Sequence, residues 1–290
     1  MAKVAVVTDS NSSITQREGE EIGVFVIPMP FYIDEKQYFE ELDLTQEAFY
    51  EFLGKGADIK TSQPAPENVL ELWDDLLKTY DEIVHIPMSS GLSGTVATAM
   101  ALASDVPYAG KVFVVDNQRI SVTLRRAVID AVNMANAGMD GESIRQKLLE
   151  EKSFSSIYIM MDTLYYLKKG GRITPAAAAI GTVLKIKPVL QIQGEKLDAF
   201  AKVRNPKQGR DIMIKQILND CSTRFNDPTG SRMHIDIAYT FDKDTAMDFK
   251  TQVETAFPGH DIEVRPLPLS VACHIGPGAL AIASSRKVEL

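Results

Sequence analysis

The chain has few of the residues from which metal centres and disulfide frameworks are built. It contains only 2 cysteines and 4 histidines in 290 residues. Cys221 and Cys273 form neither a disulfide framework nor a zinc-binding spacing, and no histidine has a second ligand at metal spacing. We therefore expect no metal site.

Long apolar runs and phosphate-binding loops are also missing. No apolar run approaches the ~20 residues that span a bilayer. Residues 1–3 lead directly into the expected strand 4–7, which predicts no signal peptide and a cytoplasmic protein. The pattern Gly-x-x-x-x-Gly-Lys-Ser/Thr does not occur. A self-contained nucleotide-hydrolysing enzyme would therefore lack the loop that binds the nucleotide phosphates.

Charge is distributed unevenly along the chain. The net charge of -8 argues against a nucleic-acid partner. Residues 160–215, in contrast, contain eleven Lys/Arg and four Asp/Glu, a local excess of +7. This excess is either a chance cluster of solvated side chains or a docking face for an acidic partner or a phosphate.

Strand and helix patterns alternate, which predicts an α/β protein. A tract of small residues at 153–156 is a candidate hinge and suggests domains 1–155 and 156–290. The expected strands are 4–7, 24–32, 83–88, 112–116, 157–161, 233–239 and 262–267, with a hairpin over 189–204. The expected helices are 14–22, 45–53, 66–80, 95–104, 122–137, 140–152, 164–185 with a break at the glycine pair 170–171, and 244–256.

The most informative segment is the loop Ser89-Ser90-Gly91-Leu92-Ser93-Gly94-Thr95. It follows the expected strand 83–88 and opens the expected helix 95–104. The first N–H groups of a helix are free, and its positive dipole end attracts anions. Hydroxyl groups at that point add donors, so the loop predicts a site for a carboxylate or a phosphate.

Part of this loop also fits another class of protein. Gly91-x-Ser93 matches the first half of the nucleophile elbow Gly-x-Ser-x-Gly, but Thr95 replaces its last glycine. Asp116 and His274 follow in the chain order of a hydrolase triad. A serine-dependent acyl hydrolase that uses Ser93 therefore remains the alternative to a binding protein.

Three further polar segments are each weak signals. Thr61-Ser62-Gln63-Pro64 suits an ordinary helix start. Gly170-Gly171-Arg172 suits a helix end with a solvated basic face. His274, in the segment 274–278 beside an apolar stretch that we expect to be a strand, suits a core residue. The Gly-x-Gly-x-x-Ala match at 276–281 leaves too few residues after it for a dinucleotide-binding unit.

Taken together, these segments resemble the DegV family of bacterial fatty-acid-binding proteins along the whole chain. The resemblance rests on the segments 7–10, 61–64, 89–95, 164–173, 184–188, 202–204 and 274–278. One segment departs from the family pattern. Where the family has Asp-Ser/Thr followed by Ser-x-Gly-x-Gly, this chain has Asp116 to Leu124 without the small residues, which we expect to narrow or reshape the site.

The resemblance implies a two-domain α/β fold. A mostly parallel sheet flanked by helices would carry the head-group loop, and a C-terminal α/β domain with a mixed sheet would complete a lipid tunnel. It also implies that one long-chain fatty acid is the ligand, with no other cofactor and no catalytic residue. Its carboxylate would be bound by Thr61, Ser93 and His274, and the supporting residues would be Ser62, Gly94 and Thr95.

The resemblance further implies a role as the lipid-presenting subunit of a fatty-acid kinase system. A separate ATP-dependent kinase would phosphorylate the bound carboxylate to an acyl-phosphate for phospholipid synthesis. Because the kinase would supply the nucleotide site, we expect no nucleotide-binding motif in this chain. Arg172, Lys202 and Arg204 are the candidate docking residues, and transient contact with a membrane surface is compatible with this role.

Overall fold

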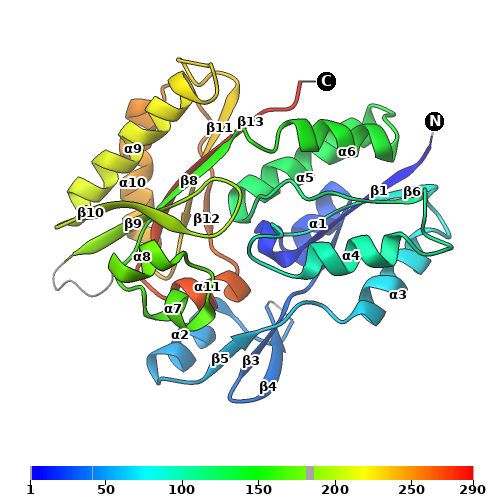
Figure 1. The fold of residues 1–290 in the computed structure, drawn as a ribbon, viewed down its shortest axis with the longest axis horizontal. Coiled ribbons are helices and arrows are strands. Elements are labelled where there is room, and N and C mark those ends of the chain that lie inside the picture. Colours follow the sequence, from blue (N-terminus) through cyan, green and yellow to red (C-terminus); the bar gives the residue numbers. More distant parts are fainter. Residues whose placement is uncertain (1, 41, 181–185, 290) are drawn as a thin grey trace.

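The computed structural model describes residues 2–40, 42–180 and 186–289. Its first layer is a parallel sheet in the order β2-β1-β6-β7. Figure 1 labels its two central strands, β1 and β6. The strands are β1 (Val4–Asp9), β2 (Val24–Ile27), β6 (Glu82–Ile86) and β7 (Val112–Val114). Their central residues are buried on both faces, as expected for a parallel sheet covered by helices on both sides.

Two groups of helices cover this sheet. One face packs on α1 (Gln16–Ile22), α5 (Ser121–Asn136) and α6 (Gly141–Glu150), and the other packs on α3 (Pro66–Leu76) and α4 (Thr95–Ala103). A short 3-10 helix, η1 (Ser10–Ser12), follows β1. The loops after β1, β6 and β7 leave from the same edge, because the carboxyl ends of parallel strands lie together.

A small antiparallel sheet follows, where we expected a single strand over 24–32. That prediction is wrong: β2 ends at Ile27, and the chain enters a different sheet at Pro30. Pro28 and Pro30 lack N–H groups, so one continuous ladder cannot form across them. The sheet has the order β4-β3-β5 and contains β3 (Pro30–Ile33), β4 (Lys36–Phe39) and β5 (Ile59–Thr61), with α2 (Gln46–Gly54) packed beside it.

The largest sheet has six strands in the order β10-β9-β8-β13-β11-β12. All of its neighbours are antiparallel except β11 and β12, so the expected mixed sheet is confirmed. The strands are β8 (Ser155–Met160), β9 (Lys187–Ile192), β10 (Asp198–Val203), β11 (Met233–Tyr239), β12 (Val264–Pro266) and β13 (Leu280–Arg286). The strand β13, which lies inside the sheet, was not predicted from the sequence.

The two faces of this sheet have different neighbours (Figure 1). The helices α9 (Pro206–Thr223) and α10 (Lys243–Ala256) cover one face. The other face looks toward the start of α5 and toward three short helices, α7 (Tyr165–Gly170), α8 (Pro175–Ile180) and α11 (Leu269–Ile275). This second face therefore lies between the two large sheets.

The helical segment expected over 164–185 breaks at its glycine pair, as predicted. Helix α7 ends at Gly170, Gly171 follows as its C-cap with a φ of 69°, and the chain resumes as α8. Residues 181–185 lie outside the described part. His274 differs from expectation, because it lies on α11 rather than beside a strand.

The α/β fold class is confirmed, and β8 begins at Ser155, one residue before the expected start of the second domain. The boundary itself stays a prediction. The later part of the chain packs back on the earlier part, since Leu269 and Cys273 of α11 share a buried cluster with Phe31 and Phe49. Within the described residues, no helix is long and apolar enough to cross a membrane.

Candidate functional site

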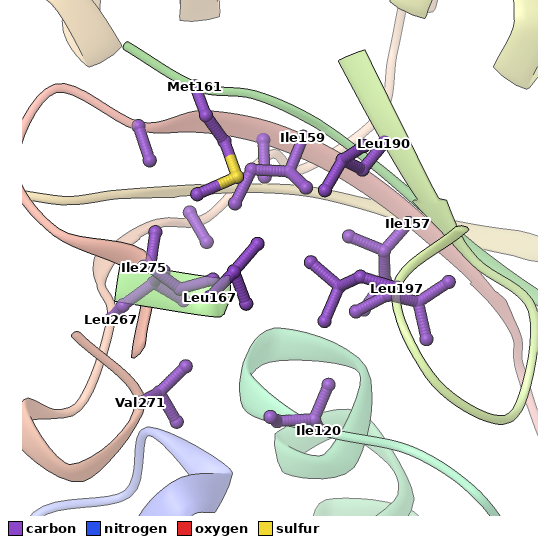
Figure 2. Packing of buried hydrophobic residues seen from close by; sticks show 14 of the residues in the cluster. Ile120, Ile157, Ile159, Met161, Leu167, Leu190, Leu197, Leu267, Val271 and Ile275 are labelled. Carbon is purple, nitrogen blue, oxygen red and sulfur yellow. The ribbon is translucent and has the colours of Figure 1, made fainter. Parts of the chain in front are cut away.

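A cavity of about 220 Å³ lies on the second face of the six-stranded sheet. This volume is more than ten times the roughly 15 Å³ that a single water molecule needs. Figure 2 shows the buried apolar cluster on this face, in which Ile159 on the sheet, Val271 on α11 and Ile120 at the start of α5 are directed toward one interior. The walls are mostly aliphatic, so the cavity suits an apolar ligand.

The alternation of side chains along the strands builds one wall. Ile157 and Ile159 of β8 line the cavity, whereas Tyr158 and Met160 pack against α9 and α10 on the other face. On β13, Ala281 pairs with Ile159 and Ala283 pairs with Ile157. Ala238 of β11 faces Ala281 in register. These three alanines leave room that larger side chains would fill.

The segment that departs from the family pattern forms another wall. Ile120, Ser121 and Val122 all line the cavity. Ser121 has a φ of 51°, a backbone conformation that side chains other than glycine seldom adopt. Two branched aliphatic side chains, Ile120 and Val122, thus lie in the segment where we expected the absence of small residues to narrow or reshape the site.

One end of the cavity is polar, and it contains the three residues expected to bind a carboxylate. Thr61, Ser93 and His274 line it, together with two supporting residues, Ser62 and Gly94. Ser62 and Gly94 are exposed, whereas the aliphatic walls are buried. The polar end therefore reaches the surface and the apolar part lies inside.

Thr61 and His274 are joined by a hydrogen bond of 2.8 Å between Oγ1 and Nε2, although 213 positions separate them in the sequence. Burial, together with the positive charge of Arg172, lowers the pKa of His274 to about 4. The ring is therefore neutral at pH 7. With its proton on Nε2 it donates to Thr61, which leaves the Thr61 hydroxyl proton free for a ligand oxygen.

The imidazole of His274 has room beside α7 because residue 170 is a glycine. A Cβ atom on Gly170 would overlap the His274 imidazole. The glycine pair that we interpreted as a helix end therefore also provides space for a residue of the site.

Ser93 is positioned by the start of α4. Its Oγ accepts a hydrogen bond of 3.2 Å from the backbone N–H of Thr95 and lies 2.8 Å from the Thr95 hydroxyl. Thr95 is buried and does not line the cavity, so it supports Ser93. The N-cap residue of α4 is Gly94, which has no side chain to cap the free N–H groups of the helix, and Gly94 borders the polar end.

Arg172 lies at the cavity, not on an open surface. Its guanidinium donates to the carbonyl groups of Leu92 and Gly170. Among the described residues it forms no ion pair with an acid. An uncompensated cation at the polar end attracts an anion.

Lys202 and Arg204 occupy a different place. Both are exposed, and Lys202 pairs with Pro188 at the far end of β10. Leu197 bonds to the backbone of Arg172, and Lys202 follows five residues later, which corresponds to roughly 16 Å of extended strand. The three expected docking residues therefore form two separate points, and their role stays a prediction.

The residues of the alternative triad have other partners. The carboxylate of Asp116 accepts hydrogen bonds from the backbone and hydroxyl of Ser90. The Nε2 of His274 bonds to Thr61, and the hydroxyl of Ser93 bonds to Thr95. No described contact joins the acid to the histidine or the histidine to the serine, as a triad requires.

Four polar residues that were not among the expected site residues also line the cavity: Asn11, Gln63, Ser121 and Ser270. Asn11 directly follows the segment 7–10, and Gln63 belongs to the segment 61–64, so both motifs extend to the site. Ser270 precedes His274 by one helical turn, and no sequence signal marked it. Among the described residues no cluster of three or more His, Cys, Asp or Glu could hold a metal ion.

The family model described as "Uncharacterised protein, DegV family" matches residues 3–287. The chain belongs to the DegV family. A DegV domain-containing protein of Clostridium acetobutylicum is 31% identical over 287 residues, which cover 97% of this chain and 96% of the relative.

Solved structures agree with this membership. A crystal structure of DegV from Bacillus subtilis, described as a fatty acid binding protein, has a TM-score of 0.86 and 28% identity, over 99% of this chain and 100% of that one. A structure described as showing fatty acid binding of a DegV family protein from Thermus thermophilus has a TM-score of 0.87 and 28% identity, over the same shares. The expected DegV fold is confirmed.

Proposed function

We propose that this DegV protein binds one long-chain fatty acid, with the acyl chain in the aliphatic cavity and the carboxylate at the polar end. The observation that carries the proposal is the contrast between the two ends of one cavity. Buried aliphatic residues line the interior. Hydroxyl groups, a neutral histidine and an arginine that forms no ion pair with any described residue lie where the cavity reaches the surface.

The physical chemistry of the ligand fits this arrangement. A carboxylate that leaves water needs hydrogen-bond donors for its oxygens. Thr61 and Ser93 offer such donors, His274 orients the Thr61 hydroxyl by donating to it, and Arg172 supplies positive charge. Each buried methylene contributes ~0.8 kcal/mol, so about 14 methylenes give ~11 kcal/mol before the entropy costs of binding. Chain burial supplies the affinity, and the polar end fixes the orientation.

This orientation suits presentation to a second protein. We propose that a separate ATP-dependent kinase phosphorylates the carboxylate to an acyl-phosphate, which then enters phospholipid synthesis. The carboxylate would lie beside exposed Ser62 and Gly94, within reach of a docked partner. Arg172 would hold the anion or the new phosphate, and Lys202 and Arg204 would contact the kinase away from the cavity.

Binding is tested with Ser93→Ala on delipidated protein. Loss of a hydrogen bond to a charged group costs about 1.5–3 kcal/mol, which corresponds to roughly 10-fold to 150-fold weaker palmitate binding in isothermal titration. Ser222→Ala is the matched control, because Ser222 is exposed on α9 and bonds within its own helix. Unchanged affinity in folded Ser93→Ala protein would contradict the head-group site.

Presentation is tested with a DegV-associated fatty-acid kinase and radiolabelled ATP. We expect Arg172→Ala and Arg204→Ala to lower acyl-phosphate formation, with Arg204→Ala leaving palmitate binding unchanged. Arg17→Ala is the control, because Arg17 is exposed on α1 and pairs only with Glu21 among the described residues. If both variants formed acyl-phosphate at the wild-type rate, the docking assignment would be wrong.

The alternative, a serine-dependent acyl hydrolase, has one supporting observation, the hydroxyl of Ser93 at the cavity. A fluorophosphonate probe labels an activated serine. We expect no labelling, because the neighbouring groups pair Ser93 with Thr95 and not with a base. Labelling of the wild-type protein that disappears in Ser93→Ala would favour the hydrolase over the binding protein.

A further inference from the structure

A second polar group lies inside the cavity, deeper than the carboxylate site. Asn11, Ser121 and Ser270 line the cavity and are only 1%, 3% and 6% exposed. They come from the 3-10 helix η1, the start of α5 and helix α11. A buried polar side chain needs a hydrogen-bond partner, and an aliphatic cavity wall offers none. The presence of these three polar side chains in the cavity therefore needs an explanation.

The side chains of this group are only partly satisfied. The Ser270 hydroxyl lies 2.6 Å from Asn11 Oδ1, and the Ser121 hydroxyl lies 3.0 Å from Ser13 Oγ. The Nδ2 atom of Asn11 is buried and has no hydrogen-bond partner among the residues that the structure describes. An amide nitrogen carries two N–H donors. One of them can point toward the buried carboxylate of Asp9, whose pKa the Asn11 side chain lowers against the larger effect of burial. At least one donor still lacks an acceptor.

The chemistry of the missing partner follows from the amide. A hydroxyl both donates and accepts, so it can pair with either end of the Asn11 side chain. A methylene group can pair with neither, and it would leave the amide buried and unsatisfied.

Helix α11 sets the distance between this group and the carboxylate site. Ser270 and His274 are four residues apart and both line the cavity. Residues at this spacing lie on one helix face with Cβ atoms about 5–6 Å apart, so an acyl chain anchored at His274 brings roughly its third to fifth carbon past Asn11.

We propose that Asn11, supported by Ser270, recognises a hydroxyl group on the acyl chain close to the carboxylate, so that the ligands of this protein include 3-hydroxy fatty acids. The proposal rests on the fatty-acid site proposed above and names a substrate class for it. Farther along the chain, the walls are Ile157, Ile159 and the alanines of β11 and β13, where a hydroxyl has no partner.

The test compares four ligands on delipidated wild-type protein by isothermal titration. We expect 3-hydroxypalmitate to bind at least as tightly as palmitate. We expect 12-hydroxystearate to bind roughly tenfold or more weakly than stearate, because its hydroxyl would be buried without a partner. If palmitate binds and 3-hydroxypalmitate binds tenfold more weakly, this inference is wrong and the fatty-acid site stands. If none of the acids binds, the proposed function itself fails.

Variants then assign the effect to Asn11. Asn11→Ala is expected to weaken 3-hydroxypalmitate about threefold to tenfold and to change palmitate less than twofold. Asn117→Ala is the matched control, since Asn117 is a buried asparagine with an unpaired Nδ2 that does not line the cavity.

Ser270→Ala, which keeps the asparagine, tests the same preference if Asn11→Ala does not fold. An equal loss for both acids in either variant would place the amide at the carboxylate and overturn the proposal. Unchanged affinity for both acids would mean that water alone satisfies the amide, and would overturn it as well.

Discussion

The alanines of β13 and β11 give the sharpest prediction about the cavity. Ala281 is 2% exposed, lines the cavity, and lies in register between Ile159 and Ala238. Ala281→Leu adds three carbon atoms to the space that the acyl chain would occupy. If two to three methylene groups of the acyl chain lose their buried place, binding weakens by ~2 kcal/mol, or about thirtyfold in the dissociation constant.

Palmitate binding is measured by isothermal titration, and ligand-free stability by urea denaturation. We expect the free energy of unfolding of Ala281→Leu to stay within about 1 kcal/mol of wild type, because the new side chain enters an existing cavity, not a packed core. Ala201→Leu is the matched control. Ala201 is a half-buried alanine in β10 of the same sheet and does not line the cavity. Wild-type palmitate affinity in folded Ala281→Leu would refute the assignment of the tail to this cavity.

Three further predictions concern the polar end and a buried acid. In ligand-free protein, NMR titration of His274 should give a pKa below about 5, and bound palmitate should raise it because a nearby anion favours the charged ring; a ligand-free value near 6.5 would contradict the buried neutral ring. Gly170→Ala should displace the imidazole and weaken palmitate binding about tenfold, whereas Gly54→Ala, at a position with open space around it, should bind normally. Burial raises the pKa of Asp130 to about 6, so the folded state binds more protons than the unfolded state between about pH 4 and 6. The unfolding free energy of wild type should therefore fall by up to about 3 kcal/mol relative to Asp130→Asn as the pH rises from 4 to 7, and parallel pH profiles would refute this.

The sequence was most informative where local chemistry decides the structure. The Ser/Gly loop at 89–95 follows a strand and opens α4, as its residues predicted, and the hairpin of β9 and β10 turns in the segment around Gly194. Thr61, Ser93 and His274 could be placed in one site because their segments resemble those of a family. No spacing in the sequence would have joined Thr61 to His274, since only the packing of α11 beside β5 brings them together.

The parts that could not be predicted depend on long-range packing. The strand β13 is rich in Ala and Ser, which gives weak strand propensity, and its place between β8 and β11 is fixed by both neighbours. Two of these small residues, Ala281 and Ala283, also line the cavity. The composition that makes the strand hard to predict therefore also helps to form the site. Asn11 was missed because its free amide is visible only when η1, α5 and α11 are placed around it.

Organic extraction of the purified protein, followed by mass spectrometry of the extract, shows whether the cavity holds a fatty acid. We expect close to one long-chain fatty acid per protein molecule, and the mass spectrum also reports chain length and any hydroxyl group. A protein that yields no acid and also takes up neither added palmitate nor added oleate would contradict the claim that this cavity is a fatty-acid site.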